Sequence, residues 1–116
     1  MEPIRREAVD EAISRFVNQD VYLHLETTNG AYAALRSEAS MAVCAYIRNG
    51  RVKFHRGSIA GDGPYRVGLK MDTGWIYAEG LTDYEVDEEG RLLLAGHDGD
   101  GRIAVALQLS LTPFPM

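Results

Sequence analysis

The hydrophobic positions of the chain follow two different periods, one before and one after Asn18. Between Pro3 and Asn18, apolar residues recur at spacings of three to five, which is typical of one face of an α-helix. These apolar residues are Ile4, Ala8, Val9, Ala12, Ile13, Phe16 and Val17. Pro3 suits the first helical turn, and Glu11 with Arg15 forms a favourable i,i+4 pair on the opposite face. The pattern predicts one N-terminal helix whose apolar side covers the core.

After Asn18, apolar and polar residues alternate and turn residues arrive at short intervals, which predicts antiparallel strands. Two Asn-Gly dipeptides supply the positive φ angles that tight hairpin turns need. The first predicted hairpin is residues 21–26, the turn Asn29-Gly30 and residues 31–36. The loop 37–40 leads to the second, made of residues 41–48, the turn Asn49-Gly50 and residues 51–55.

The second half of the chain continues this pattern of strands and short connections. Gly57 to Pro64 holds three glycines and a proline, so it is predicted to be an ordered surface loop rather than a strand. A third hairpin is expected from residues 65–71 and 75–79, with Gly74 in the left-handed position of its loop. The connections 87–90 and 96–101 then flank an apolar run, 91–95, and the last strand is residues 102–111, with Ile103, Val105, Leu107, Leu109 and Leu111 on one face.

This order of elements predicts a mainly β (α+β) fold. An N-terminal helix packs on a strongly curved antiparallel sheet, a barrel or a compact sandwich of about eight strands. Parallel strands are not expected, because no second helix exists to make crossovers. A length of 116 residues suits one hydrophobic core, so residues 1–116 are interpreted as a single domain.

Charge and composition narrow the classes of partner. Twelve Lys and Arg against seventeen Asp and Glu give a formal net charge of −5, which disfavours nucleic acid and anionic membranes as partners. The apolar runs are too short to cross a bilayer, and the N terminus has no apolar signal region, so we expect a cytoplasmic protein. Cys44 is the single cysteine, which excludes an internal disulfide and any thiolate cluster. No cofactor is predicted.

Three polar side chains could carry chemistry if the fold brings them together. His24 and Glu26 share one face of a predicted strand, and His97 precedes Asp98 in a predicted loop. Their spacing matches no recognised zinc signature, so no metal site is predicted, and His24 and Glu26 are expected to hydrogen-bond within the sheet. An enzyme that uses His24, Glu26 and His97 is a hypothesis that requires these side chains to converge.

A thiol and an imidazole form a second candidate pair. If Asn49-Gly50 is a two-residue hairpin turn, Cys44 lies opposite His55, and the imidazole could lower the pKa of the thiol. The alternative interpretation is a small, buried cysteine without reactivity.

Polar and aromatic residues also gather on shared strand faces, and Tyr65-Arg66 follows the glycine-rich stretch. Such a mixture is typical of a ligand cavity or a partner surface, and it also occurs on the plain solvent side of a sheet. The candidate ligand-binding residues are His24, Glu26, Tyr46, Arg48, Tyr65, Arg66 and His97.

Five segments of the chain carry a family resemblance: HLETTNGAYA at residues 24–33, AYIRN at 45–49, GPYRVGLK at 63–70, GWIYAEGLT at 74–82 and VDEEGRLLLAGHD at 86–98. Through these segments the chain resembles the YojF family of bacilli and their relatives. The resemblance implies a mostly β fold and no established reaction or catalytic residues. It also implies a setting, because genes of this family tend to lie beside one for a zinc-dependent N-acetylglucosaminyl deacetylase of the bacillithiol pathway.

Three functions are therefore compared. The first is a non-enzymatic interaction or accessory protein that forms a homo-oligomer or docks on the sugar deacetylase. The second is a protein that binds a small molecule, either a sugar-thiol or an anionic metabolite, through tyrosines and arginines. The third is the enzyme considered above.

Overall fold

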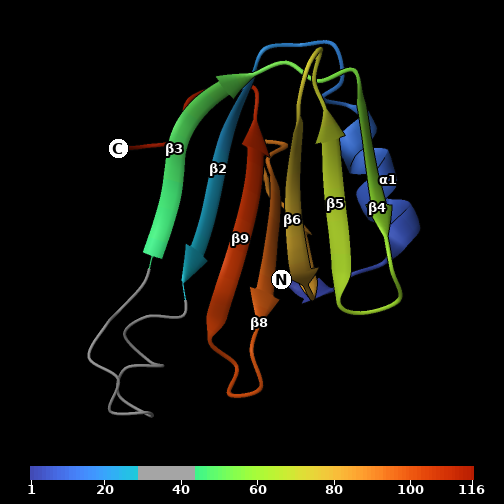
Figure 1. The fold of residues 1–116 in the computed structure, drawn as a ribbon, viewed down its shortest axis with the longest axis vertical. Helices are drawn as coiled ribbons and strands as arrows, with labels where there is room; N and C mark the ends of the chain where they lie inside the picture. Colours follow the sequence, from blue (N-terminus) through green and yellow to red (C-terminus); the bar gives the residue numbers. More distant parts are fainter. Residues whose placement is uncertain (29–43) are drawn as a thin grey trace.

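The structure is a computed structural model that describes residues 1–28 and 44–116. One helix and nine strands lie in these residues, so the mainly β prediction is confirmed (Figure 1). In chain order they are β1 (Glu2–Pro3), α1 (Arg6–Ser14), β2 (Val21–Thr28), β3 (Cys44–Val52), β4 (Arg56–Ala60), β5 (Tyr65–Lys70), β6 (Trp75–Leu81), β7 (Asp83–Val86), β8 (Leu92–His97) and β9 (Ile103–Ser110). The predicted turn at Asn29-Gly30, the strand 31–36, the loop 37–40 and residues 41–43 fall outside the described residues.

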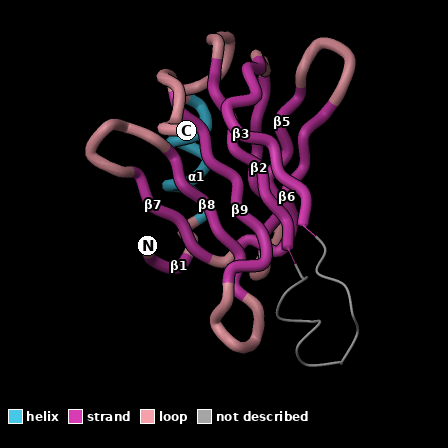
Figure 2. Tube along the Cα trace, turned by 90° about the vertical axis from the view of Figure 1, so that its left-hand side faces the viewer, coloured by secondary structure: helices cyan, strands magenta, loops and turns pink. Residues whose placement is uncertain are grey.

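The strands form two separate antiparallel sheets. One has six strands in the order β1-β7-β8-β9-β2-β3, and the other has three in the order β4-β5-β6 (Figures 1 and 2). Every strand pair is antiparallel, as predicted. The chain leaves the large sheet after β3 and returns to it at β7, so the sheets do not close into a barrel. The barrel among the predicted architectures is therefore wrong.

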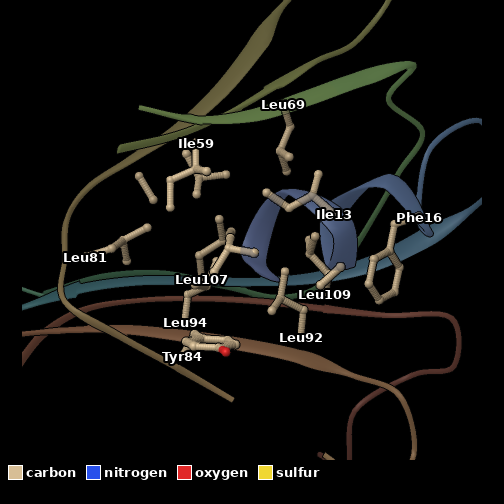
Figure 3. Packing of buried hydrophobic residues seen from close by; sticks show 14 of the residues in the cluster. Ile13, Phe16, Ile59, Leu69, Leu81, Tyr84, Leu92, Leu94, Leu107 and Leu109 are labelled. Carbon is tan, nitrogen blue, oxygen red and sulfur yellow. The ribbon is translucent and has the colours of Figure 1, made fainter. Parts of the chain in front are cut away.

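The hydrophobic core lies between the two sheets, and α1 fills the space between them on one side (Figure 3). Ile13 and Phe16 from the helical region lie beside side chains of both sheets, including Leu69 of β5 and Leu109 of β9. The predicted apolar face of the helix is thus confirmed, and so is the Glu11–Arg15 pair, at 3.0 Å. Val105, Leu107 and Leu109 of β9 are buried, which confirms the predicted inner face for these three residues. Ile103 at the start of the strand and Leu111 just past its end are exposed, so for them the prediction is wrong.

The helix begins later than the periodicity predicts. Pro3 belongs to β1, where it pairs with Asp83 at the edge of the large sheet, so its predicted place in the first helical turn is wrong. The next residue continues this edge, because the Ile4 N–H donates to the Thr82 carbonyl oxygen at 3.0 Å. Proline is tolerated at a sheet edge because the missing N–H is not needed there.

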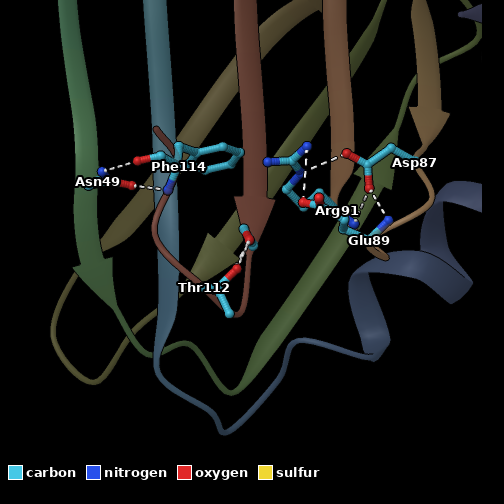
Figure 4. A network of polar contacts seen from close by, with 7 residues as sticks. Asn49, Asp87, Glu89, Arg91, Thr112 and Phe114 are labelled. Carbon is cyan, nitrogen blue, oxygen red and sulfur yellow. Dashed lines mark hydrogen bonds and ion pairs between the residues drawn. The ribbon is translucent and has the colours of Figure 1, made fainter. Parts of the chain in front are cut away.

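Asn49-Gly50 is a bulge inside β3 and not a hairpin turn, so the second predicted hairpin is wrong. Gly50 pairs with Leu23 and Ile47 with Leu25, which leaves two residues of β3 opposite His24. Asn49 has a φ of 57°, a conformation that asparagine tolerates better than most residues. A long-range contact explains this use of the dipeptide. Asn49 Nδ2 donates to the Phe114 carbonyl oxygen at 2.9 Å, and the Phe114 N–H donates to Asn49 Oδ1 at 2.7 Å (Figure 4).

Gly57 lies in strand β4, so the loop predicted for residues 57–64 is wrong over its first four residues. A Cβ atom at this position would stand 2.4 Å from Ile13 Cγ2, closer than any real contact. The glycine therefore allows α1 to pack directly on β4. The loop is confined to residues 61–64, in which Gly61 and Gly63 adopt left-handed φ angles.

The remaining connections largely follow the predictions. The third hairpin is confirmed by the pairing of Lys70 with Trp75, although Gly74 is not left-handed. Gly90 and Gly101 adopt left-handed conformations in the predicted turns before and after β8. That strand extends through His97, which corrects the prediction that Gly96 and His97 belong to a loop.

Candidate functional site

Three of the predicted ligand-binding residues lie together on the outer face of the large sheet. His24 Nε2 is 3.0 Å from Glu26 Oε1, which confirms the predicted hydrogen bond within the sheet. Tyr46 of β3 pairs with Glu26 of β2, and its ring centroid is 6.4 Å from that of His24. The buried Nδ1 atom of His24 has no hydrogen-bond partner in the part of the chain that the structure describes.

Arg48 holds the C-terminal segment against the large sheet. Its Nη2 atom donates to the Pro115 carbonyl oxygen at 2.7 Å, and its Cζ atom lies 4.8 Å from the centroid of the Phe114 ring. Arg91 approaches the same ring at 5.7 Å (Figure 4). Phe114 is buried by these contacts, so Arg48 has a structural contact that the strand pattern does not reveal.

Tyr65 and Arg66 belong to β5 and therefore to the other sheet. Arg66 Nη1 lies 3.3 Å from Glu79 Oε1, and its Cζ atom lies 5.3 Å from the Tyr77 ring centroid. The candidate residues that the sequence groups together are thus divided between the two sheets.

His97 lies apart from His24. His24 of β2 pairs with Gln108 of β9, whereas His97 of β8 pairs with Ile103 of β9. The two histidines are therefore separated by five residues of β9, on the order of 17 Å along the strand. His97 instead lies beside Asp83 of β7, with its Nδ1 atom 3.0 Å from Asp83 Oδ1. The catalytic hypothesis, which requires His24, Glu26 and His97 to converge, loses its geometric basis.

The predicted pairing of Cys44 with His55 is wrong. Because residues 49–50 do not form a turn, Cys44 pairs with Thr28 in the ladder between β2 and β3. His55 instead precedes β4, with its Nδ1 atom 3.6 Å from Asp72 Oδ1. Cys44 is exposed, so the alternative interpretation as a buried cysteine is wrong as well.

Residues 1–28 and 44–116 hold neither a cluster of metal ligands nor a membrane-spanning helix. No group of three or more His, Cys, Asp or Glu side chains within these ranges could hold a metal ion. The helix that they contain is not long and apolar enough to span a membrane.

The outer face of the three-stranded sheet is a functional candidate of which sequence reasoning singled out only Arg66. Its side chains come from alternate positions of β4, β5 and β6, and we call it the aromatic–cationic face. It comprises Arg56, Ser58, Ala60, Arg66, Gly68, Lys70, Trp75, Tyr77 and Glu79. Strand register brings these residues side by side, and the only sequence signal is a matching alternation in three consecutive strands.

Two stacked rings form the centre of this face. The ring centroids of Trp75 and Tyr77 are 5.4 Å apart, with an interplanar angle of 8°. Arg56 and Lys70 lie 5.5 and 5.0 Å from the Trp75 centroid, within cation–π range. Gly68 makes room for the two stacked rings, because a Cβ atom there would stand 2.9 Å from the Tyr77 ring. Trp75 and Tyr77 remain 38% and 50% exposed, so an aromatic surface bordered by cations faces outward.

A cleft between β6 and the large sheet is the second candidate. It encloses about 520 Å³, and His97 lies on its wall. His97 Nδ1 is 3.0 Å from Asp83 Oδ1 and 3.3 Å from Thr82 Oγ1. The hydrogen bond from Thr82 lowers the pKa of Asp83 most strongly, and His97 lowers it further, while burial opposes both. Asp83 is therefore an ionised acceptor at neutral pH.

Comparisons with known proteins agree with the fold. A family model described as "Protein of unknown function (DUF1806)" matches residues 3–114. A protein of Bacillus subtilis (strain 168), "Uncharacterized protein YojF", is 54% identical over 114 residues, which are 98% of each chain. The crystal structure of the Bacillus subtilis YojF protein superposes with a TM-score of 0.83 at 49% identity, covering 99% of this chain and 97% of that one.

Proposed function

The chain belongs to the DUF1806 family, whose function is unknown, and we propose on this premise that it is a non-enzymatic interaction protein. The aromatic–cationic face is the surface that docks on its partner. The single observation that carries this proposal is the exposed stack of Trp75 and Tyr77 with cations on its borders. Tryptophan, tyrosine and arginine are the residues that most often dominate the binding energy of protein interfaces.

Charge defines the chemistry of the partner. The face carries three cations and one carboxylate, in a chain whose formal net charge is −5. The net charge of this face is therefore positive, whereas the net charge of the whole protein is negative. Complementary potentials favour correct partners and repel others, so we expect a partner with an acidic surface around an apolar pocket or ridge.

The proposed partner is the zinc-dependent N-acetylglucosaminyl deacetylase of the bacillithiol pathway, in the cytoplasm. The YojF-like character of the chain supports this choice, because genes of that family tend to lie beside the gene for such an enzyme. The protein would then act as an accessory subunit. A second copy of this chain, which is also acidic overall, is the competing occupant.

The experiment is a calorimetric titration of the full chain with the purified deacetylase, combined with light scattering of each protein alone. Tyr77→Ala removes half of the aromatic stack, and Tyr46→Ala is the matched control, because Tyr46 is exposed on the other sheet. We expect Tyr77→Ala to weaken binding by about 2 kcal/mol, or roughly thirtyfold. Tyr46→Ala should change the affinity less than about twofold, and added salt should weaken binding.

Three outcomes would count against this proposal. Equal losses for the two variants would show that the face is not the docking surface. Undetectable binding to the deacetylase would remove that partner. If the chain alone forms an oligomer that Tyr77→Ala dissociates, the occupant of the face is a second copy.

A further inference from the structure

The two edges of the three-stranded sheet differ in what covers them. Its edge strands are β4 and β6. On the β4 edge, the Ile59 N–H donates to Asp10 Oδ1 of α1 at 3.2 Å, so the helix caps this edge. On the β6 edge, no further strand pairs with β6 within residues 1–28 and 44–116. An edge strand with unpaired backbone groups is a template for one more strand.

The hydrogen-bond pattern of the hairpin between β5 and β6 shows where the backbone groups of β6 point. The Met71 N–H donates to the Gly74 carbonyl oxygen at 2.8 Å, so these two residues form a hydrogen-bonded pair. Such pairs alternate with non-hydrogen-bonded pairs along an antiparallel ladder, which makes Gly68 and Tyr77 a non-hydrogen-bonded pair. The N–H and C=O groups of Tyr77 therefore point away from β5. The same alternation applies to Glu79, which precedes the left-handed Gly80.

This free edge borders the cleft of about 520 Å³ between the sheets. Four consecutive residues of β6, at positions 77–80, line the cleft. Side chains alternate between the faces of a strand, so an unbroken run of lining residues is a strand met from its edge. The cleft is closed at Gly80, whose carbonyl oxygen would stand 2.0 Å from a Cβ atom on Gly96. The Tyr77 ring leaves the edge uncovered, because it lies over Gly68 of β5.

The inner face of the large sheet extends beyond β6. The small sheet contacts the large one where β6 lies against β8 and β9. Leu25 of β2 lines the cleft, and Ile47 of β3 pairs with Leu25, so both side chains point to the same side. Ile47 is 50% exposed. Neighbouring strands lie about 4.8 Å apart, so a fourth strand beside β6 would cover this apolar surface.

We infer that β6 accepts an extended, acidic segment of the partner as a fourth, antiparallel strand of the small sheet. The partner is the protein that docks on the aromatic–cationic face, so this site rests on the proposed function. Alternate side chains of the segment lie over Leu25 and Ile47 and are apolar. The others join the aromatic–cationic face, where Arg66 lies 5.3 Å from the Tyr77 ring centroid. Three cations against one carboxylate favour acidic side chains at these outer positions.

The test is hydrogen exchange, followed by NMR on the isotope-labelled full chain, with a capped nonapeptide of alternating valine and glutamate. In the free protein, the amides of Tyr77 and Glu79 should exchange fast and that of Ala78, which faces β5, slowly. A saturating dose of the peptide should slow exchange at Tyr77 and Glu79 at least about tenfold and leave Ala78 unchanged.

Modified peptides separate backbone pairing from other modes of binding. With the valines inward in an antiparallel strand, the glutamate amides face β6. N-methylation of the glutamates should therefore abolish binding. N-methylation of the valines, whose amides face away, is the matched control and should change the affinity less than about threefold. Lysines in place of the glutamates should weaken binding about tenfold.

A pair of variants of the chain tests the apolar wall. Ile47→Asp should weaken binding of the glutamate peptide at least about tenfold, because the inward valines lose an apolar contact. Val86→Asp is the matched control and should have an effect below about twofold. Val86 is 41% exposed and lies in β7, on the far side of the large sheet from β3.

Four results would overturn this site. They are no slowing of exchange with the glutamate peptide, equal effects of the two N-methylations, tighter binding of the lysine peptide, and slow exchange at Tyr77 in a free protein that light scattering shows to be a dimer. The last result would make a second copy the occupant. Deacetylase binding that leaves the Tyr77 and Glu79 amides unprotected would overturn the strand pairing and leave the proposed function standing. Peptide binding without deacetylase binding would support the site and remove that partner.

Discussion

The contact between Asn49 and the C-terminal segment makes a strong prediction about stability. The two hydrogen bonds between the Asn49 side chain and the Phe114 backbone are worth about 1 kcal/mol each. Asn49→Gly removes both bonds but tolerates the φ of 57°, so we expect a loss of about 2 kcal/mol. Asn49→Ala removes the same bonds and, unlike glycine, keeps a Cβ atom in the left-handed region without asparagine's local hydrogen bonding, so it should cost about 1–2 kcal/mol more than Asn49→Gly.

Urea unfolding followed by the fluorescence of Trp75, the single tryptophan, measures these differences. A double-mutant cycle of Asn49→Gly with Phe114→Ala adds a test of mechanism. Arg48 and Arg91 flank the Phe114 ring, so undocking the segment by either change removes the contacts that the other would disrupt. We expect the double variant to be more stable than the sum of the single losses predicts, by about 1 kcal/mol.

Two results would refute this role of Asn49. If Asn49-Gly50 acted as a turn of its own, Asn49→Gly would leave the free energy of unfolding unchanged or raise it, since glycine also suits positive φ. Strict additivity with Phe114→Ala would likewise refute the proposed coupling.

Three further predictions concern the core, acid stability and the thiol. Gly57→Ala should cost about 2–3 kcal/mol in urea unfolding because its Cβ atom would overlap α1, whereas Gly99→Ala, with open space around it, should cost less than about 1 kcal/mol; equal losses would contradict the close contact. Burial alone would raise the pKa of Asp87, but hydrogen bonds from Arg91 and from backbone N–H groups outweigh it and lower the pKa. The ionised Asp87 carboxylate therefore stabilises the folded state above the ordinary aspartate pKa of about 3.9, and this contribution is lost as the pH falls below that value. Asp87→Asn should therefore flatten the acid side of the stability profile, and an unchanged slope would refute this. Cys44 is exposed and should react with a chromogenic disulfide reagent in the native state nearly as fast as in urea; slow native labelling would show that it is covered.

Much of the fold could be predicted from alternation and turn residues, because these report which face of a strand is buried. The predictions failed where distant contacts decided the local structure. Asn49-Gly50 has the composition of a hairpin turn, yet its conformation serves a contact with Phe114, which is 65 residues away. Gly57 looks like a strand breaker, yet it is needed because α1 lies on top of it.

The candidate sites were harder to predict than the strands. The aromatic–cationic face requires the register of three strands, and a one-residue shift would turn Tyr77 toward the core. The polar residues that the sequence grouped by type, such as His24 and His97, lie five residue rows apart along the same sheet. Residue type alone therefore could not locate either candidate surface.

The position of β9 has a consequence for synthesis on the ribosome. This strand lies between β8 and β2, so it joins the first long strand to the last ones. The inner wall formed by Leu107 and Leu109 is missing until residue 110 has left the exit tunnel. The nascent chain therefore exposes apolar surface until β9 emerges, and the large sheet is complete only when β9 joins β8 to β2.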